Sequence, residues 1–182
     1  MTILPRIACC VQREIHATRN TQPTTANHLL FIAYGNTLRR DDGAGLALAE
    51  KLLPLLRNQG LQIELITIQQ LTPELALDIA NPQLDGVCFF DTATEPHPHA
   101  IQVQPVGSSD GVPVLGHHLI PSALLLYAKQ LFGVCPPSWL VTIPGYDFAL
   151  GEGFSPTTAS HLANVAPLAQ TLAQLPTQVD RL

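Results

Sequence analysis

The chain has few charged side chains and no long apolar run. Charged residues make up 13% of the 182 residues, and the formal net charge is −5. A basic face for nucleic acid is therefore not expected. No run approaches the ~18 apolar residues of a membrane span, and residues 1–7 are too short and interrupted for the apolar core of a signal peptide. These absences predict a cytoplasmic protein that binds neither nucleic acid nor membrane.

Familiar catalytic and metal motifs are also missing. No Ser-His-Asp or Cys-His set stands at usual spacing, and no H-E-x-x-H occurs. The four cysteines show neither zinc-ribbon nor disulfide spacing. Cys88 and Cys135 lie in apolar stretches, which predicts buried thiols, and the adjacent pair Cys9-Cys10 alone is weak evidence for a soft metal. The sequence therefore indicates neither a standard catalytic triad nor a protease of the H-E-x-x-H type.

The first 28 residues differ from the rest. Three arginines and one glutamate give residues 1–28 a net charge of +2, and their second half is rich in Thr, Asn and Gln. Such a segment has little to bury. We therefore expect a mobile N-terminal extension over 1–28 and one domain over 29–182.

Apolar periodicity predicts the fold class. Strands are expected at residues 29–34, 61–68, 86–90 and 139–143, and a possible edge strand between prolines at 100–103. Helices are expected from Ala44 onward and at 72–80, 122–132 and about 156–175, with Thr72 as an N-cap and Pro73 at the first helical position. This alternation predicts a single-domain, three-layer α/β/α fold with a mostly parallel, twisted sheet of about five strands.

Three ionisable side chains follow these predicted strands. Asp42, beside Asp41, follows the first strand; Asp91 follows the third; His117 stands before the helix at 122–132. The carboxyl ends of parallel strands meet at one rim, so the three should converge. Two carboxylates and an imidazole suit nickel or zinc. Taken singly, an aspartate could equally be a helix cap or a turn residue.

The sequence gives weaker evidence of a functional role for other polar residues near this rim. His97 and His99 form an H-x-H pair, but prolines flank it, so a surface loop is expected. Tyr146, Asp147 and Glu152 lie in a Gly-rich loop at the same rim. They could contact a substrate or simply belong to a solvated loop.

The motifs resemble those of one known family. The stretch GNTLRRDDGAG, residues 35–45, is similar to the N-terminal signature of the hydrogenase maturation proteases. FFDTA at 89–93 and H-x-x-x-P at 117–121 follow in that family's order, and the resemblance covers residues 29 to about 174. The Gly-rich turn that many relatives carry after the second strand is absent here, so Gln69 or Gln70 would have to supply its role.

The resemblance implies an endopeptidase, often classed as aspartic-type. It would remove a C-terminal peptide from the precursor of a [NiFe]-hydrogenase large subunit once nickel has been inserted. The nickel belongs to the substrate, and no organic cofactor is implied. By motif register the residues that recognise it are Asp42, Asp91 and His117. Asp41 is then a helper or a cap, and spacing to Pro121 favours His117 over His118.

The resemblance leaves the chemistry open. Nickel could polarise the scissile carbonyl as a Lewis acid, or it could fix the register while Asp41 or Asp42 activates water. The enzyme is expected to act as a monomer on the precursor.

Two other interpretations use the same residues. A non-proteolytic, nickel-sensing assembly factor could bind the large subunit through the same ligands without cutting it. A phosphate cradle at residues 35–45 is not expected, because the loop lacks the Lys-Ser/Thr of a P-loop. Its two aspartates would also repel phosphate at a helix start.

Overall fold

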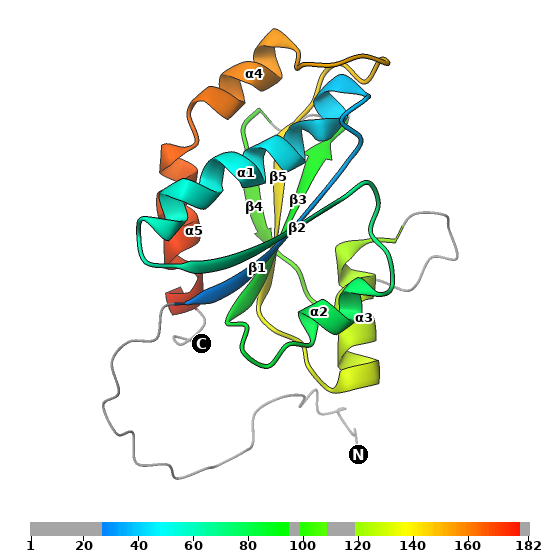
Figure 1. Cartoon of the computed structure of the whole chain (residues 1–182), viewed down its shortest axis with the longest axis vertical. Coiled ribbons are helices and arrows are strands. Elements are labelled where there is room, and N and C mark those ends of the chain that lie inside the picture. The colour runs from blue at the N-terminus through cyan, green and yellow to red at the C-terminus, as the bar shows by residue number, and fades with distance from the viewer. Residues whose placement is uncertain (1–26, 95–98, 109–118, 179–182) are drawn as a thin grey trace, which may run out of the picture.

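A five-stranded sheet forms the middle layer of the protein (Figure 1). The computed structural model describes residues 27–94, 99–108 and 119–178. The strand order is β2-β1-β3-β5-β4, and only β4 runs antiparallel to its neighbour. The strands are β1 (His28–Tyr34), β2 (Gln62–Ile68), β3 (Gly86–Ala93), β4 (Gln102–Pro105) and β5 (Ser138–Pro144). The predicted fold class is confirmed, as is the edge position of the strand between prolines.

Helices cover both faces of this sheet (Figure 1). They are η1 (Arg40–Gly43), α1 (Ala44–Arg57), α2 (Leu75–Ile79), α3 (Pro121–Phe132), α4 (Pro156–Ala163) and α5 (Ala166–Gln178). The helices α1, α4 and α5 pack on one face, and α2 and α3 pack on the other. Within the described ranges, no helix is both long and apolar enough to cross a bilayer.

The strand β1, which lies between β2 and β3, is buried on both faces, as its continuous apolar sequence predicts. Leu29, Phe31 and Ala33 join the core beneath α1, α4 and α5. Leu30 and Ile32 point the other way, into the core beneath α2 and α3. The Phe31 ring packs against the Phe90 ring of β3, with centroids 4.7 Å apart. Two separate cores therefore share one sheet, and the strand ends carry the polar residues.

Two predicted helices differ from the structure. The helix expected over 156–175 is broken between α4 and α5 at Asn164 and Val165. Pro167 lies in the first turn of α5, and it has no N–H to continue the preceding helix. The helix expected from Thr72 begins only at Leu75. The turn before it has hydrogen bonds between residues three apart, as in a 3-10 helix, and the first runs from the Leu75 N–H to the Thr72 carbonyl at 3.2 Å.

Other expectations had mixed outcomes. Cys88 is buried, as predicted, and burial raises the pKa of its thiol to about 12. Cys135 is exposed, contrary to prediction, because α3 ends at Gly133 in the left-handed conformation and a coil leads to β5. The third strand continues through Asp91, so this residue lies within β3. Residues 1–26, which hold Cys9-Cys10 and most of the extension predicted over 1–28, lie outside the described residues, and His28 begins β1.

Candidate functional site

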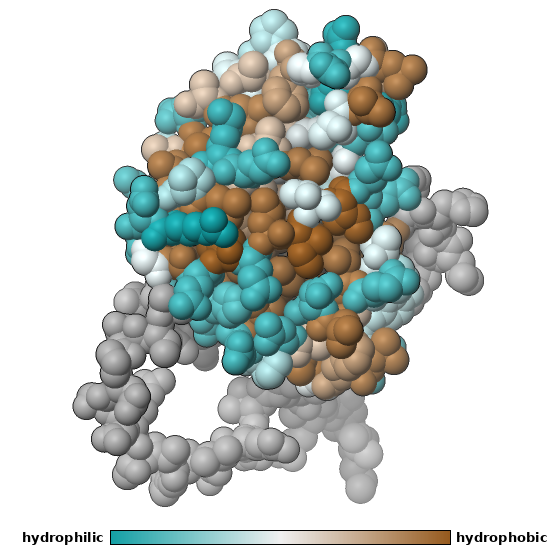
Figure 2. Space-filling view, viewed as in Figure 1, coloured by the Kyte–Doolittle hydropathy of each residue, from teal (hydrophilic) through white to brown (hydrophobic). Residues whose placement is uncertain are grey.

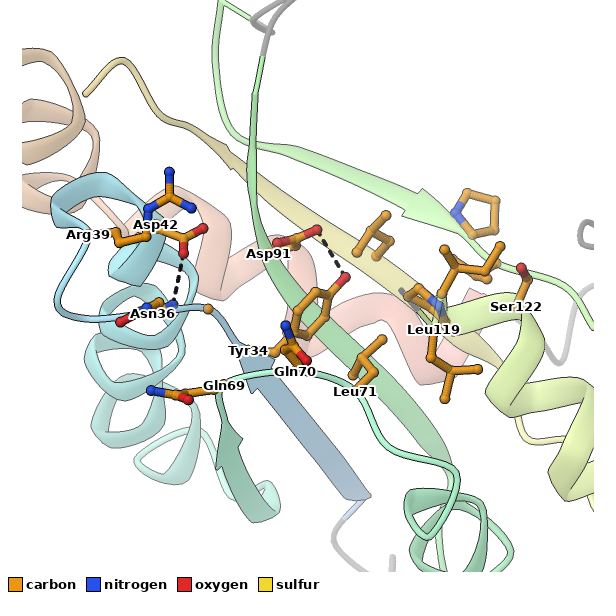
Figure 3. A pocket seen from close by; sticks show the side chains of 16 residues that line it. Tyr34, Asn36, Arg39, Asp42, Gln69, Gln70, Leu71, Asp91, Leu119 and Ser122 are labelled. Carbon is orange, nitrogen blue, oxygen red and sulfur yellow. Dashed lines mark hydrogen bonds between the residues drawn. The ribbon is translucent and has the colours of Figure 1, made fainter. Parts of the chain in front are cut away.

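The site lies where the chain reverses its direction across the sheet. From β1 the chain passes through α1 on one face to β2, and then through α2 on the other face to β3. In open α/β sheets, ligands bind at such a switch point, outside the carboxyl ends of the strands. A cavity of about 710 Å³ lies here, and both Asp42 and Asp91 line it (Figure 3).

Asp42 presents one carboxylate oxygen that no described residue engages. It lies in η1 and is partly exposed. Its Oδ2 accepts a hydrogen bond from the Asn36 backbone N–H at 3.1 Å. Within the described part of the chain, Oδ1 accepts none. Asp42 therefore has acceptor capacity left for a ligand or a water molecule in the cavity.

Asp91 is held more tightly. Its Oδ2 accepts from the Tyr34 hydroxyl at 3.0 Å, and its Oδ1 accepts from the Thr92 N–H at 2.8 Å. Burial raises the pKa of Asp91 to about 6; the two hydrogen bonds oppose this shift, and the Asp42 charge adds to it. Burial and the Asp91 charge also raise the pKa of Tyr34, so Tyr34 is a neutral donor. Above about pH 6 the cavity holds a charged carboxylate on Asp91.

Close backbone contact brings these two carboxylates to one cavity. A Cβ on Gly45, in the first turn of α1, would stand 3.0 Å from the Asp91 backbone, so a larger residue would push the two backbones apart by a few tenths of an ångström. The Gly45 N–H donates to the Thr92 Oγ1 at 3.1 Å. Gly35 has a φ of +143°, and a Cβ there would stand 2.0 Å from the Asp42 carbonyl oxygen. Gly45 thus sets the distance between the two motifs, and Gly35 allows the tight turn within the first.

Asp41 has a different environment from its neighbour. It is fully buried, and its carboxylate accepts five hydrogen bonds. The donors are the backbone N–H groups of Tyr146, Asp147 and Ser155 and the hydroxyls of Ser155 and Thr158. Burial alone would raise the pKa of Asp41, but these hydrogen bonds outweigh it and lower the pKa to about 2. Asp41 holds the segment between β5 and α4 against η1.

Arg40 ties the same two segments together. Its guanidinium pairs with the Asp147 carboxylate, and its backbone N–H donates to the Gly151 carbonyl at 3.1 Å. Arg40 has a φ of +45°, a conformation uncommon for a residue with a Cβ. Asp147, for which the sequence left both substrate contact and a solvated loop open, is bonded within the protein to Arg40 and to the Ala149 N–H.

The rest of the cavity wall mixes polar and apolar groups (Figure 3). Gln69 and Gln70 line it, at the turn where the resemblance predicted a substitute for the Gly-rich motif. The opposite wall is largely apolar, with Leu71, Pro105, Val106, Leu119, Ile120, Pro121 and Leu140. The cavity therefore has an acidic side, near η1, and an apolar side, near the start of α3.

Most of the histidines that the sequence singled out lie outside the described residues. His117, His118 and His97 lie outside the described residues, so the predicted third ligand stays a prediction. His99 is exposed. Among the described residues, no three His, Cys, Asp or Glu side chains gather closely enough to hold a metal ion. Asp42 and Asp91 supply two acidic groups.

Sequence reasoning missed Tyr34 and Arg39, which also line the cavity. Tyr34 ends the first strand, so its place at the carboxyl rim could have been predicted from the sequence. Arg39 lies three residues before Asp42, and the sequence did not indicate that its side chain would lie at the cavity.

Comparison with known proteins supports the fold. No protein-family model and no curated protein matches the chain. The structure is similar to the [NiFe] hydrogenase maturation protease HycI from Thermococcus kodakarensis KOD1, with 20% identity, a TM-score of 0.60, and coverage of 85% of this chain and 95% of that one. It is also similar to an endopeptidase from Escherichia coli, with 20% identity, a TM-score of 0.61, and coverage of 81% and 92%.

A third solved structure, the hydrogenase maturating endopeptidase HybD from E. coli, is 21% identical, with a TM-score of 0.54 and coverage of 83% and 93%. The chain therefore has the three-layer fold of the hydrogenase maturation proteases. This agrees with the resemblance that its motifs carry.

The Asp41 hydrogen bonds predict a pH-dependent contribution to stability. Asp41→Asn should lower the free energy of unfolding at pH 7 by about 3 kcal/mol, because buried donors lose their acceptor. The folded-state pKa, about 2, is below the ordinary 3.8. The wild-type advantage should therefore be complete above pH 4 and shrink as the pH falls toward 2. Urea unfolding across this pH range measures it.

The control for this experiment is Glu50→Gln, which changes an exposed carboxylate on α1. This variant should unfold as the wild type does at pH 7. Equal stability of wild type and Asp41→Asn, or a gap that stays constant down to pH 2, would contradict the assignment.

Proposed function

We propose that this protein is an endopeptidase that removes a C-terminal peptide from the precursor of a [NiFe]-hydrogenase large subunit. One observation carries the proposal: Asp42 and Asp91, from the two motifs that resemble the hydrogenase maturation proteases, line one cavity at the switch point of that fold. The fold alone would not define an activity. The proposal therefore rests on the residues at the site.

The charge of the cavity favours a cation. Two carboxylates share its acidic side, and the Asp42 charge raises the pKa of Asp91. A divalent cation brought by the substrate would relieve this repulsion. We assign recognition of the precursor's nickel to Asp42, Asp91 and His117, the last from its sequence position. In this proposal the nickel belongs to the substrate, and it places the bond to be cleaved.

Hydrolysis then requires a base for water. A carboxylate has about four acceptor positions, so Asp42 can contact the cation and still accept a proton from water. Asp91 has a hydrogen bond on each oxygen, and the Asp41 carboxylate has five. Of the two aspartates that sequence left open as water activators, the contacts favour Asp42. Precise positioning of the bound substrate against this base can lower the activation barrier by roughly 7–11 kcal/mol.

Exposed apolar side chains near the cavity fit a polypeptide substrate. Leu150 is 83% exposed, Leu38 59% and Phe154 38%. They lie on the two segments that Arg40 joins, and the Gly151 N–H donates to the Leu38 carbonyl at 2.9 Å. Figure 2 shows apolar atoms at the end of the molecule where η1 and the segment before α4 lie. Apolar groups held in water on a fixed backbone are typical of a protein-binding surface.

Removing either cavity carboxylate should stop cleavage. Asp42→Asn and Asp91→Asn are each expected to lower the cleavage rate of the nickel-loaded precursor at least ~100-fold, because each loses a charge that faces the substrate. Gel electrophoresis of the precursor follows cleavage, and circular dichroism checks the fold. Asp78→Asn, on α2, is the control and should cleave normally. Normal cleavage by either cavity variant with an unchanged spectrum would refute the site.

The apolar surface predicts an effect on substrate binding. Leu150→Ser should raise the KM for the precursor about tenfold, equivalent to about 1.4 kcal/mol, and leave kcat unchanged. The matched control is Leu131→Ser, which changes a leucine on α3 that is 70% exposed. Initial rates over a range of precursor concentrations measure both constants. Equal KM values for the two variants would show that this surface does not bind the substrate.

A further inference from the structure

The cavity is also lined by a positively charged side chain, Arg39, to which the proposed function assigns no role. Arg39 is the only positively charged residue among the described residues that line the cavity. Its backbone is fixed in the turn that carries Asp42: its N–H donates to the Asn36 carbonyl at 3.0 Å, and its carbonyl accepts from the Asp42 N–H at 3.1 Å. A β-bridge to Gly151 holds it from the other side. The side chain therefore starts from a defined position.

The guanidinium of Arg39 has a single hydrogen bond to the described residues. Its Nε donates to the Phe148 carbonyl at 3.3 Å. Within the described residues, no carboxylate lies within 4.0 Å of it, and its terminal nitrogens donate no hydrogen bond to the protein. Figure 3 shows the group beside Asp42 at the acidic side of the cavity. Four N–H donors on a full positive charge are thus available to a ligand.

The next residue, Arg40, shows the contrasting arrangement. Its charge is neutralised by the Asp147 carboxylate, and it does not line the cavity. Two adjacent arginines therefore differ. Arg40 joins two segments of the protein through its ion pair, whereas Arg39 lines the cavity and has no ion pair among the described residues. A guanidinium next to a reacting bond lowers the energy of negative charge that develops there.

We propose that Arg39 binds the carbonyl oxygen of the bond that is cleaved and stabilises the negative charge that develops on it. This inference rests on the proposed function. Water adds to the carbonyl carbon, its proton passes to Asp42, and the carbonyl electron pair moves onto the oxygen that faces Arg39. When the carbonyl re-forms, the C–N bond breaks, and the leaving amine takes the proton from Asp42. Arg39 stays protonated throughout, as its high pKa requires.

This role predicts an effect on kcat with little change in KM. Arg39→Gln should lower kcat for the precursor by about 100-fold to 1,000-fold, the usual loss when one donor to such an oxygen is removed, with KM within threefold. Arg39→Lys keeps the charge but loses the planar fork, so it should recover only part of the rate. Lys51→Gln removes an exposed charge from α1, away from the cavity, and should cleave as the wild type does.

Chemical rescue separates this role from a structural one. Guanidinium chloride at millimolar concentration, added to Arg39→Ala, should restore part of kcat, because the free cation can occupy the emptied position. An unchanged kcat in Arg39→Gln, a rise in KM alone, or failure of guanidinium to restore activity to Arg39→Ala would each overturn the inference. If the wild type itself does not cleave the loaded precursor, the proposed function falls, and the inference falls with it. Cleavage by wild type and by Arg39→Gln at equal rates overturns the inference alone.

Discussion

The site depends on the buried carboxylate of Asp41. Its five hydrogen bonds join η1 to a segment more than a hundred residues later in the chain. An unpaired buried carboxylate would be very costly, so this contact strongly favours one arrangement of the two segments. With η1 fixed, Asp42 lies at the cavity, and Arg39 lies beside it. A residue that makes no contact with the cavity thus sets the geometry of those that do.

Two adjacent aspartates have opposite roles for a physical reason. Asp41 is fully buried, and its hydrogen bonds outweigh the effect of burial, so its pKa is low and its oxygens are occupied. Asp42 has one oxygen without a partner among the described residues, and it lines the cavity. Gly45 allows α1 to contact the backbone of Asp91, which brings the second carboxylate to the same place. Neighbouring residues of one loop thus supply a structural contact and a carboxylate that lines the cavity.

Sequence predicted the fold and part of the site, because both follow from local patterns. Apolar runs such as 29–34 identify buried strands, and the topology of a parallel sheet then brings Asp42 and Asp91 to one rim. The role of Asp41 had no local signal, since its partners lie in residues 146–158. The direction of the Arg39 side chain depends on the distant Phe148 carbonyl. His117 lies outside the described residues and stays a prediction.

The central claim is that this protein cleaves a nickel-loaded precursor. The most direct test is the intact mass of a purified [NiFe]-hydrogenase large-subunit precursor after incubation with the protein, with nickel-loaded and nickel-free samples in parallel. We expect loss of a C-terminal peptide from the loaded precursor only. Equal cleavage of both samples would contradict nickel recognition by the site. Stable binding of the loaded precursor with no change of mass would contradict the peptidase activity and favour an assembly factor.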